Sequence, residues 1–266
     1  MNIILGFVLS ALIASLAWKA GALNRSGALA AILTGGLIFG FGGLPWAVLL
    51  LTFFISSSLL SRLFARHKAS LDEKYAKGSR RDWGQVLANG GLGALLALLH
   101  ALYPDQDWPW IAFIGAMSAV NADTWATELG AFSPTPPRRI TSGVQVEPGT
   151  SGGVTLLGYG AAIGGAALIG LEGAFISLPA SALSGIWITV LAGLAGTTAD
   201  SLLGATLQAI YYCPACEKET ERHPLHSCGA NTNHLRGWRS LNNDWVNFCC
   251  SLVGALAAVG FWAVWG

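Results

Sequence analysis

Long apolar stretches with almost no charge constrain this chain more than any other feature of its sequence. Several reach the roughly 20 residues that an α-helix needs to cross the hydrocarbon core of a bilayer. Only 11% of the residues are charged and 53% are hydrophobic, whereas about 25% are charged in soluble domains. Such a chain cannot cover a folded surface with polar side chains. We therefore expect one all-α integral membrane domain over residues 1–266.

The apolar segments predict about eight transmembrane helices. We place them at residues 2–18, 27–43, 46–61, 85–103, 110–132, 153–170, 179–212 and 245–265. The seventh segment is too long for one crossing and too short for two, so it is tilted, broken near Gly196, or extended beyond the membrane. The first segment lacks preceding basic residues and a clear cleavage site, which favours a retained helix over a secretory signal.

The positions of the charges predict how the helices are oriented. Acidic residues mark two turns, near Asp105 and near Glu172. Basic residues cluster in four other connections: Lys19 with Arg25, residues 62–81, Arg138 with Arg139, and residues 218–239. The positive-inside rule places these basic connections in the cytoplasm and both termini outside. The net charge of +1 gives no reason to expect a nucleic-acid partner.

Four acidic residues stand inside or at the ends of apolar segments: Asp123, Glu128, Asp200 and Asp244. An ionised carboxylate at bilayer depth costs at least about 2.5 kcal/mol, so these residues need partners or a wet cavity. A structural ion pair is the weaker interpretation, because no Lys or Arg lies in the segments that hold Asp123, Glu128 and Asp200. The predicted topology brings all four acids to the cytoplasmic side. We therefore expect one catalytic site, with Mg²⁺ bound by Asp123, Asp200 and Asp244.

Amide side chains accompany these acids. Asn121 precedes Asp123, and Asn243 precedes Asp244, so either amide could orient the metal or a phosphate. On a helix Asn121 and Glu128 would share one face, and Asp123 would lie on another. The string NADT at 121–124 also resembles TADS at 198–201, a faint internal repeat of the kind found in transporters.

A glycine-rich turn precedes the sixth apolar segment. It consists of Gly149, Thr150, Ser151, Gly152 and Gly153. Such a turn at a helix N-terminus offers backbone N–H groups and a positive dipole to a phosphate. The alternative is a flexible turn that only lets two helices approach. The string at Asn89, followed by two glycines, is a similar but weaker signal.

Basic residues also precede the fourth apolar segment, namely Lys74, Lys77, Arg80 and Arg81. Alone they are typical of an ordinary positive-inside loop that contacts anionic lipid. Together with carboxylates, Mg²⁺ and backbone donors, Arg80 and Arg81 would help to neutralise a bound triphosphate.

Cysteines and histidines gather in the connection at residues 213–240. Cys213 and Cys216 form a C-x₂-C pair, and His226 and Cys228 follow about ten residues later. This donor set and spacing predict a structural zinc site in a small cytoplasmic loop. His223 or His234 could replace His226, and unmetallated cysteines are the alternative.

Several of these motifs together resemble the membrane protein family that contains the plant and cyanobacterial phytyl-phosphate kinases. The matching strings are QVLANGG at 85–91, NADTWATELG at 121–130, GTSGGV at 149–154, TADSLLGATLQ at 198–208, the Cys-rich loop, and NNDWVN at 242–247. The resemblance implies transfer of a phosphoryl group from a nucleoside triphosphate, with CTP the expected donor, to an isoprenoid monophosphate such as phytyl phosphate. The product would be the diphosphate.

The sequence thus predicts a Mg²⁺-dependent isoprenoid-phosphate kinase. We expect a multi-pass protein of a prokaryotic plasma membrane or a thylakoid, surrounded by membrane lipids, with its active site on the cytoplasmic side. Two alternatives need many of the same residues. One is a CTP-dependent nucleotidyltransferase that makes a CDP-lipid, and the other is a transporter of a charged solute.

Overall fold

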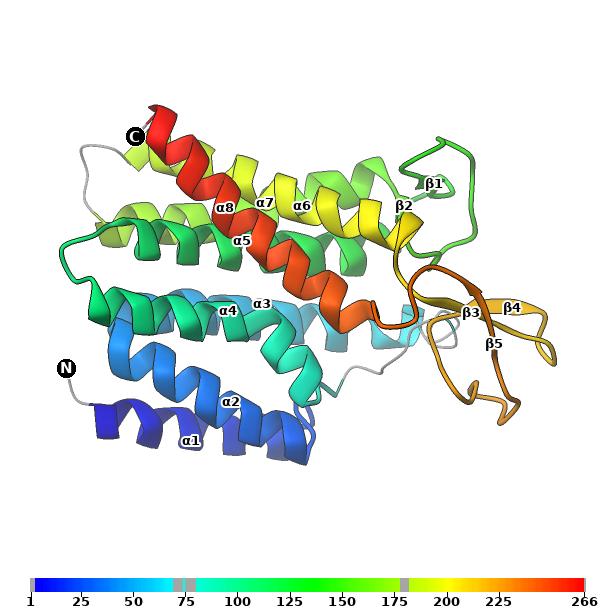
Figure 1. Ribbon diagram of the computed structural model, residues 1–266, viewed down its shortest axis with the longest axis horizontal. Helices are drawn as coiled ribbons and strands as arrows, with labels where there is room; N and C mark the ends of the chain where they lie inside the picture. The colour runs from blue at the N-terminus through cyan, green and yellow to red at the C-terminus, as the bar shows by residue number, and fades with distance from the viewer. Residues whose placement is uncertain (1–2, 69–73, 75–79, 178–181, 266) are drawn as a thin grey trace.

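The computed structural model describes residues 3–68, 74, 80–177 and 182–265. Most of these residues are helical, and the helices lie side by side along one long direction (Figure 1). The all-α class is therefore confirmed. The helices are α1 Ile3–Lys19, α2 Arg25–Leu37, a π-helix Ile38–Gly42 that continues α2, α3 Leu44–Lys68, α4 Trp83–Leu102, α5 Trp108–Gly130, α6 Leu156–Ser177, α7 Ala182–Thr206 and α8 Asn243–Trp265.

Two small antiparallel sheets lie at one end of the helices, opposite the two chain termini (Figure 1). The first pairs β1 Arg138–Arg139 with β2 Gly153–Val154. The second has the strand order β4-β3-β5, with β3 Ile210–Cys213, β4 Lys218–Thr220 and β5 Asn233–Arg236. The predicted Cys/His loop at 213–240 therefore contains β4, β5 and the last residue of β3, joined by longer connections.

Six helical segments of the described chain are long and apolar enough to cross a membrane by length and composition. The expected number was eight, so that count is corrected to six. The helix α1 falls outside the set because it has only 17 residues. The helix α5 has 23 residues but includes Asn121, Asp123 and Glu128, which lower its mean hydropathy. The class of a polytopic helical membrane protein stands.

The long apolar segment at 179–212 combines two kinds of structure. The helix α7 ends at Thr206, and the apolar run continues into β3, where Ile210 and Tyr211 are buried. Extension beyond the helix, one of the three alternatives, therefore explains its excess length. The helix is not broken at Gly196. A side chain there would overlap α5 and α8, because an added Cβ would lie 2.4 Å from the Cβ of Ala119 and 2.8 Å from the carbonyl oxygen of Cys250.

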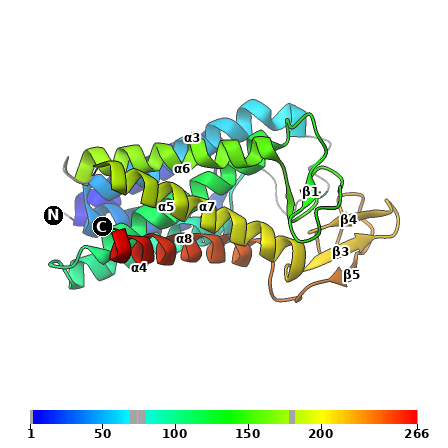
Figure 2. The same ribbon diagram turned by 90° about the horizontal axis from the view of Figure 1, so that it is seen from above.

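The helix α5 packs against α6, α7 and α8, which Figure 2 shows from above together with the rest of the bundle. Small residues set these distances. An added Cβ at Gly254 of α8 would lie 2.5 Å from the Cβ of Ala119, and one at Gly193 of α7 would lie 2.6 Å from the Oγ of Ser118. Close approach through small residues is typical of membrane helices. It brings the polar faces of α5 and α7 together.

The charged connections separate only in part as the sequence predicts. Glu172, which was expected in an acidic turn, lies inside α6, where its Oε1 accepts a hydrogen bond of 2.7 Å from Thr52 of α3. The turn between α1 and α2 meets the segment before α4, where Leu23 pairs with Arg81. These residues, the strands and the start of α8 lie at one end, while the α4–α5 turn with Asp105 lies at the other (Figure 1). The basic residue Lys77 lies outside the described residues. One end of the bundle is therefore basic, and the other carries the acidic turn.

Candidate functional site

A cavity of about 570 Å³ lies at the strand end of the helices. Its wall combines three kinds of group: acidic side chains from α5 and α7, a half-buried arginine before α4, and the glycine-rich turn before α6. Of the residues predicted for the site, it includes Asp123, Glu128, Asp200, Arg81, Asn89, Asn243 and all of Gly149, Thr150, Ser151, Gly152 and Gly153. The structure thus gathers most of the predicted residues around one space.

Asp123 of α5 and Asp200 of α7 form the acidic centre of this cavity. Their carboxylate oxygens and the sulfur of Cys250 in α8 all lie within 4.8 Å of one another. The hydroxyl of Thr197 donates a hydrogen bond of 2.9 Å to Oδ1 of Asp123. Oδ2 of Asp200 is buried and has no hydrogen-bond partner among the described residues. Two half-buried carboxylates with an unsatisfied oxygen fit a hard divalent cation such as Mg²⁺.

The other predicted residues of α5 divide between the cavity and the core. Glu128 lines the cavity, and its Oε1 accepts a hydrogen bond of 2.8 Å from Ser61. Asn121 is fully buried away from the cavity: its amide nitrogen donates to the carbonyl oxygen of Gly165 at 2.8 Å, and its oxygen accepts from Ser56 at 2.9 Å. In the structure Asn121 joins α3, α5 and α6.

The two predicted arginines have different positions. Arg81 lines the cavity, and its guanidinium donates hydrogen bonds of 2.7 Å to Ser58 and 3.0 Å to Ser57. Burial lowers the pKa of Arg81 to about 10, and the negative charge of Glu128 opposes this shift. Arg81 therefore stays positively charged at neutral pH. Arg80 is exposed and does not line the cavity.

Lys74 connects the basic segment to the glycine-rich turn. Its ammonium group lies 2.7 Å from Oε2 of Glu147 and donates a hydrogen bond of 3.0 Å to the carbonyl oxygen of Pro148. The hydrogen bond and charge of Lys74 lower the pKa of Glu147. Because Glu147 is exposed, we treat this ion pair as a weak contact.

The glycine-rich turn packs directly on α7. Gly149 and Gly152 have φ of +79° and +78°, a left-handed conformation that favours glycine. A Cβ at Gly152 would lie 2.5 Å from the backbone nitrogen of Ala205. The helix α6 begins at Leu156, three residues after the predicted start at Gly153, because Gly153 and Val154 form β2. The turn therefore forms a wall of the cavity held by β-pairing and helix contact.

The start of α8 contributes amides and a thiol. Asn243 lines the cavity together with Asn247, and Cys250 lies near the two aspartates. These three residues share a helix face by their i, i+4 and i+7 spacing. Asp244 falls on a neighbouring face, outside the cavity lining, in the first turn of the helix. An acid at this position is favourable because the helix dipole is positive there.

Sequence reasoning missed Glu221, the acid that links the cavity to the three-stranded sheet. Its Oε1 accepts hydrogen bonds from Ser151 at 2.8 Å and from Gln208 at 2.7 Å. No local pattern marks Glu221, because it follows a run of other charged residues in a polar loop. Thr197 was also missed, although its i, i+3 spacing to Asp200 places both on one face of α7.

A smaller apolar cavity of about 80 Å³ adjoins the polar one. The two share Arg81, Gln85 and Asn89 in their walls. The rest of the small cavity comes mostly from apolar side chains of α1 to α4, such as Ala14 and Phe54, together with the hydroxyl residues Ser10 and Thr34. A ligand with a polar head and an apolar tail could therefore extend from one space into the other.

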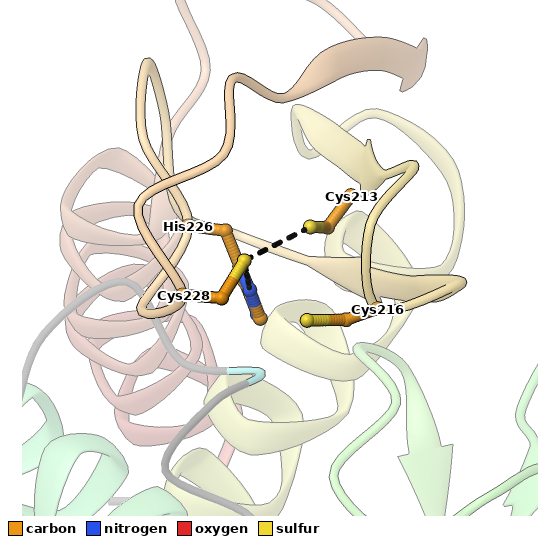
Figure 3. Close-up of side chains that lie close together, drawn as sticks. All are labelled: Cys213, Cys216, His226 and Cys228. Carbon is orange, nitrogen blue, oxygen red and sulfur yellow. Dashed lines mark hydrogen bonds between the residues drawn. The ribbon is translucent and has the colours of Figure 1, made fainter.

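The predicted zinc ligands lie together at the end of β3, the central strand of the three-stranded sheet. Ligand atoms of Cys213, Cys216, His226 and Cys228 all lie within 4.8 Å of one another (Figure 3). The sulfurs of Cys213 and Cys228 are 3.6 Å apart, and Nδ1 of His226 is 3.3 Å from the sulfur of Cys228. Hydrogen bonds from the backbone of Ala230 and from His226 lower the pKa of Cys228 to about 6, which favours its thiolate form.

His223 and His234, the alternatives to His226, take other roles. The ring of His223 stacks on Tyr211 at a centroid distance of 4.3 Å, and Nε2 of His234 lies 3.0 Å from the carbonyl oxygen of Gly237. Among the described residues, neither belongs to the group of close ligand atoms. His226 is therefore the histidine that faces the three thiols.

The sequence matches the model of a family described as integral membrane protein DUF92 over residues 8–255. The chain is 33% identical to Protein PGR of Arabidopsis thaliana, over 95% of this chain and 93% of that protein. It is 32% identical to an uncharacterised membrane protein of Methanocaldococcus jannaschii, over 91% of this chain and 86% of that protein. A third relative, an uncharacterised membrane protein of Synechocystis, is 28% identical over 82% of this chain. No solved structure matches the chain.

Proposed function

This chain belongs to the integral membrane protein family DUF92, and from that premise we propose that it is a Mg²⁺-dependent kinase of isoprenoid monophosphates. One observation carries the proposal. A polar cavity with paired aspartates, a half-buried arginine and a glycine-rich turn adjoins an apolar cavity between the first four helices. The polar groups suit phosphates, and the apolar neighbour suits a hydrocarbon chain.

Asp123 and Asp200 would hold Mg²⁺, because their oxygens are close and Oδ2 of Asp200 has no other hydrogen-bond partner in the described chain. The bound Mg²⁺ would neutralise the donor phosphates and stabilise the charge of the transferred group. Thr197 orients Asp123 through its hydrogen bond. Glu128 is close enough to act electrostatically on Arg81, and Asn243 offers an amide to the same space.

Phosphate groups would meet the positive wall of the cavity. The guanidinium of Arg81, fixed by Ser57 and Ser58, offsets negative charge on the donor. In the turn at Gly149–Gly153, Gly149 and Gly152 have positive φ and carry no side chain. The backbone N–H groups of the turn would therefore be able to approach a phosphate closely. We take CTP as the donor to test first, on the resemblance described above.

In the proposed reaction an oxygen of the lipid phosphate attacks the γ-phosphorus of the nucleoside triphosphate and forms a new P–O bond. The bond from the γ-phosphorus to the β–γ bridging oxygen breaks, and its electron pair leaves with the nucleoside diphosphate. The attacking phosphate is already an anion at neutral pH, so the step needs no general base. The products are the isoprenoid diphosphate and a nucleoside diphosphate.

The acceptor would approach from the bilayer. Its phosphate would lie near Arg81, and its apolar chain would begin in the small cavity lined by Ala14, Phe54 and their neighbours. A cavity of about 80 Å³ holds only the first part of an isoprenoid. The rest of the chain would lie among the helices or in lipid. This arrangement favours a substrate with a long apolar tail, of which phytyl phosphate is one example.

We also propose that the cavity faces the cytoplasm of a prokaryotic cell or the equivalent side of a thylakoid. The support is the gathering of basic connections at the cavity end of the helices (Figure 1). Nucleoside triphosphates are made on that side. A cysteine introduced at Arg139 should therefore react with an impermeant reagent only from the cytoplasmic side of sealed vesicles, and one at Asp105 only from the other side.

The decisive experiment incubates purified protein with Mg²⁺, each of the four nucleoside triphosphates and a panel of prenyl monophosphates, followed by mass analysis of the lipids. Formation of prenyl diphosphate supports the kinase. A CDP-lipid would instead identify a nucleotidyltransferase. If neither product forms with any combination, the proposal fails, and uptake of phosphorylated solutes into liposomes would test the transporter alternative.

A further inference from the structure

In the three-stranded sheet at the cavity end, the buried apolar side chains of the strands all come from β3. Its strands contain only four, three and four residues. Two- and three-stranded sheets of this size are marginal without a hydrophobic face or a cross-link. The sheet and its connections nevertheless hold four potential metal ligands in one cluster, namely Cys213, Cys216, His226 and Cys228 (Figure 3).

The distances within the cluster match a metal site better than a disulfide. A disulfide would bring two sulfurs to about 2.05 Å, whereas the sulfurs of Cys213 and Cys228 are 3.6 Å apart. Tetrahedral zinc with Zn–S bonds of about 2.3 Å places two sulfurs about 3.8 Å apart. It places nitrogen and sulfur about 3.6 Å apart, and the observed separation between His226 and Cys228 is 3.3 Å.

The donor set also selects the metal. Three thiols and one imidazole are the ligands of closed structural zinc sites, and they are poor ligands for Mg²⁺ or Ca²⁺. Cys213 ends β3 and Cys216 follows it in the β3–β4 connection, while His226 and Cys228 come from the β4–β5 connection. A metal at this point would therefore join both connections of the sheet.

The same sheet holds two groups that reach the cavity wall. Glu221 follows β4 and accepts hydrogen bonds from Ser151 of the glycine-rich turn and from Gln208. Arg236 of β5 donates to the carbonyl oxygens of Gly204 and Ala205 at 3.1 Å each, near the end of α7. The position of the sheet thus fixes contacts with both the turn and α7.

We propose that Cys213, Cys216, His226 and Cys228 bind one structural zinc ion, and that this ion holds the sheet against the glycine-rich turn and the end of α7. The ion closes the two connections of the sheet with protein ligands only. Its role is to position Glu221 and Arg236. The inference does not depend on the proposed kinase activity, and its test uses no turnover measurement.

Elemental analysis of the full-length protein, purified in detergent without chelators, is the first test. We expect about one zinc ion per chain. The double variant Cys213→Ser, Cys216→Ser should contain at least tenfold less zinc per chain than the wild-type protein. Cys249→Ser, which removes a thiol of α8 outside the cluster, should retain it. Wild-type protein that lacks zinc even after purification in zinc-containing buffer would overturn the site.

Thiol reactivity provides a second test that needs no variant. Cys228 is exposed, so burial alone would leave it open to a thiol reagent. A zinc-bound Cys228 should resist modification until a strong chelator is added, and it should then react together with Cys213 and Cys216, as mapped by peptide mass analysis. Equal rates of Cys228 modification with and without chelator would contradict zinc binding.

Hydrogen exchange tests the positioning role. After chelation, amide exchange in β3, β4 and β5 and in the glycine-rich turn should rise by tenfold or more, whereas exchange in the middle of α8 should not change. Zinc that can be removed without any change in exchange at the turn would refute this role. Exchange that rises along the whole chain would show global unfolding and would also count against it.

Discussion

Asp123 of α5 and Asp200 of α7 lie far apart in the sequence, yet their carboxylate oxygens approach within 4.8 Å. Two carboxylates at this distance in a partly buried site repel one another unless a cation lies between them. The hydroxyl of Thr197 bonds only to Asp123, and Oδ2 of Asp200 has no hydrogen-bond partner in the described chain. The pair is therefore arranged to receive a positive charge.

The first prediction replaces each aspartate separately by asparagine. Asp123→Asn and Asp200→Asn keep size and polarity but remove a charge that would bind Mg²⁺. Phosphoryl transfer should fall by about 10² or more, the scale expected when an electrostatic element of the transition state is lost. Thermal stability without metal should stay the same or rise, because one of two repelling charges has been removed. Initial rates and thermal unfolding measure the two effects.

Asp105→Asn is the matched control, since Asp105 lies in the α4–α5 turn at the other end of the helices. It should keep wild-type activity and stability. Asp244→Asn tests whether Asp244 binds Mg²⁺, as the sequence predicts, or lies outside the site, as the cavity lining indicates. Because Asp244 does not line the cavity, its loss should reduce activity far less than the loss of Asp200. Full activity in both Asp123 and Asp200 variants would show that the pair is structural.

The second prediction concerns Arg81, which lines the cavity and bonds to two serines. Arg81→Gln removes the positive charge and both hydrogen bonds. Activity should fall by about tenfold or more, because hydrogen bonds to charged groups contribute about 1.5–3 kcal/mol. The neighbouring Arg80→Gln should leave activity almost unchanged, since Arg80 is exposed and outside the cavity. Equal losses in both variants would indicate general electrostatic attraction rather than a role specific to Arg81.

The overall class of the fold could be predicted because lipid imposes a strong hydropathy pattern on the sequence. Every helix of the bundle corresponds to one predicted apolar segment. Hydropathy cannot tell an apolar helix from a buried strand, so the predicted segment at 179–212 ran past the end of α7 at Thr206 and into β3. It also predicted a span at residues 110–132, yet α5 is not among the six candidate spans, because its acids and amides lower its mean hydropathy.

The candidate site was predictable where charge in an apolar segment marked it, as at Asp123 and Asp200. It was not predictable where the decisive property was which face of a helix a residue occupies. Asn121 and Asp244 are as polar as Asp123 and Asn243, which line the cavity. However, Asn121 is buried in the core, and Asp244 lies outside the cavity lining. Glu221 reaches the cavity only because the Cys/His loop folds back over the glycine-rich turn.

The third prediction tests the glycine-rich turn. Gly152→Ala places a side chain on a residue with φ of +78° and within 2.5 Å of the backbone nitrogen of Ala205. Gly143 has a similar φ of +70°, but an added Cβ meets no atom within 4 Å. Gly143→Ala should therefore cost only the backbone strain of about 1–2 kcal/mol, whereas Gly152→Ala should cost more and also reduce activity. Thermal unfolding of both variants in the same detergent measures the difference.

The fourth prediction concerns the contact between the sheet and the turn. Glu221→Ala removes the acceptor used by Ser151 and Gln208, and it leaves two donors to find other partners. Loss of such contacts costs about 1–3 kcal/mol each, so the turn should loosen and activity should fall. Glu221→Gln keeps an acceptor oxygen and should recover part of the loss. Zinc content should not change in either variant. An active, unaltered Glu221→Ala protein would show that this contact is dispensable.

The last prediction tests whether the small apolar cavity receives the isoprenoid chain. Gly90 is one of its lining residues, and an added Cβ there meets only Thr34, at 3.9 Å. Gly90→Leu should therefore fold while its longer side chain occupies the cavity. Displacing two methylene groups of a substrate from apolar surroundings costs about 1.6 kcal/mol, at about 0.8 kcal/mol each, which is roughly a tenfold rise in KM. Gly91→Leu is the control, because Gly91 follows Gly90 directly in α4 but does not line the cavity. The KM for a long prenyl monophosphate should rise only in the Gly90 variant, and the KM for a five-carbon acceptor should change little in either. If the long and short acceptors respond equally, the chain is bound elsewhere.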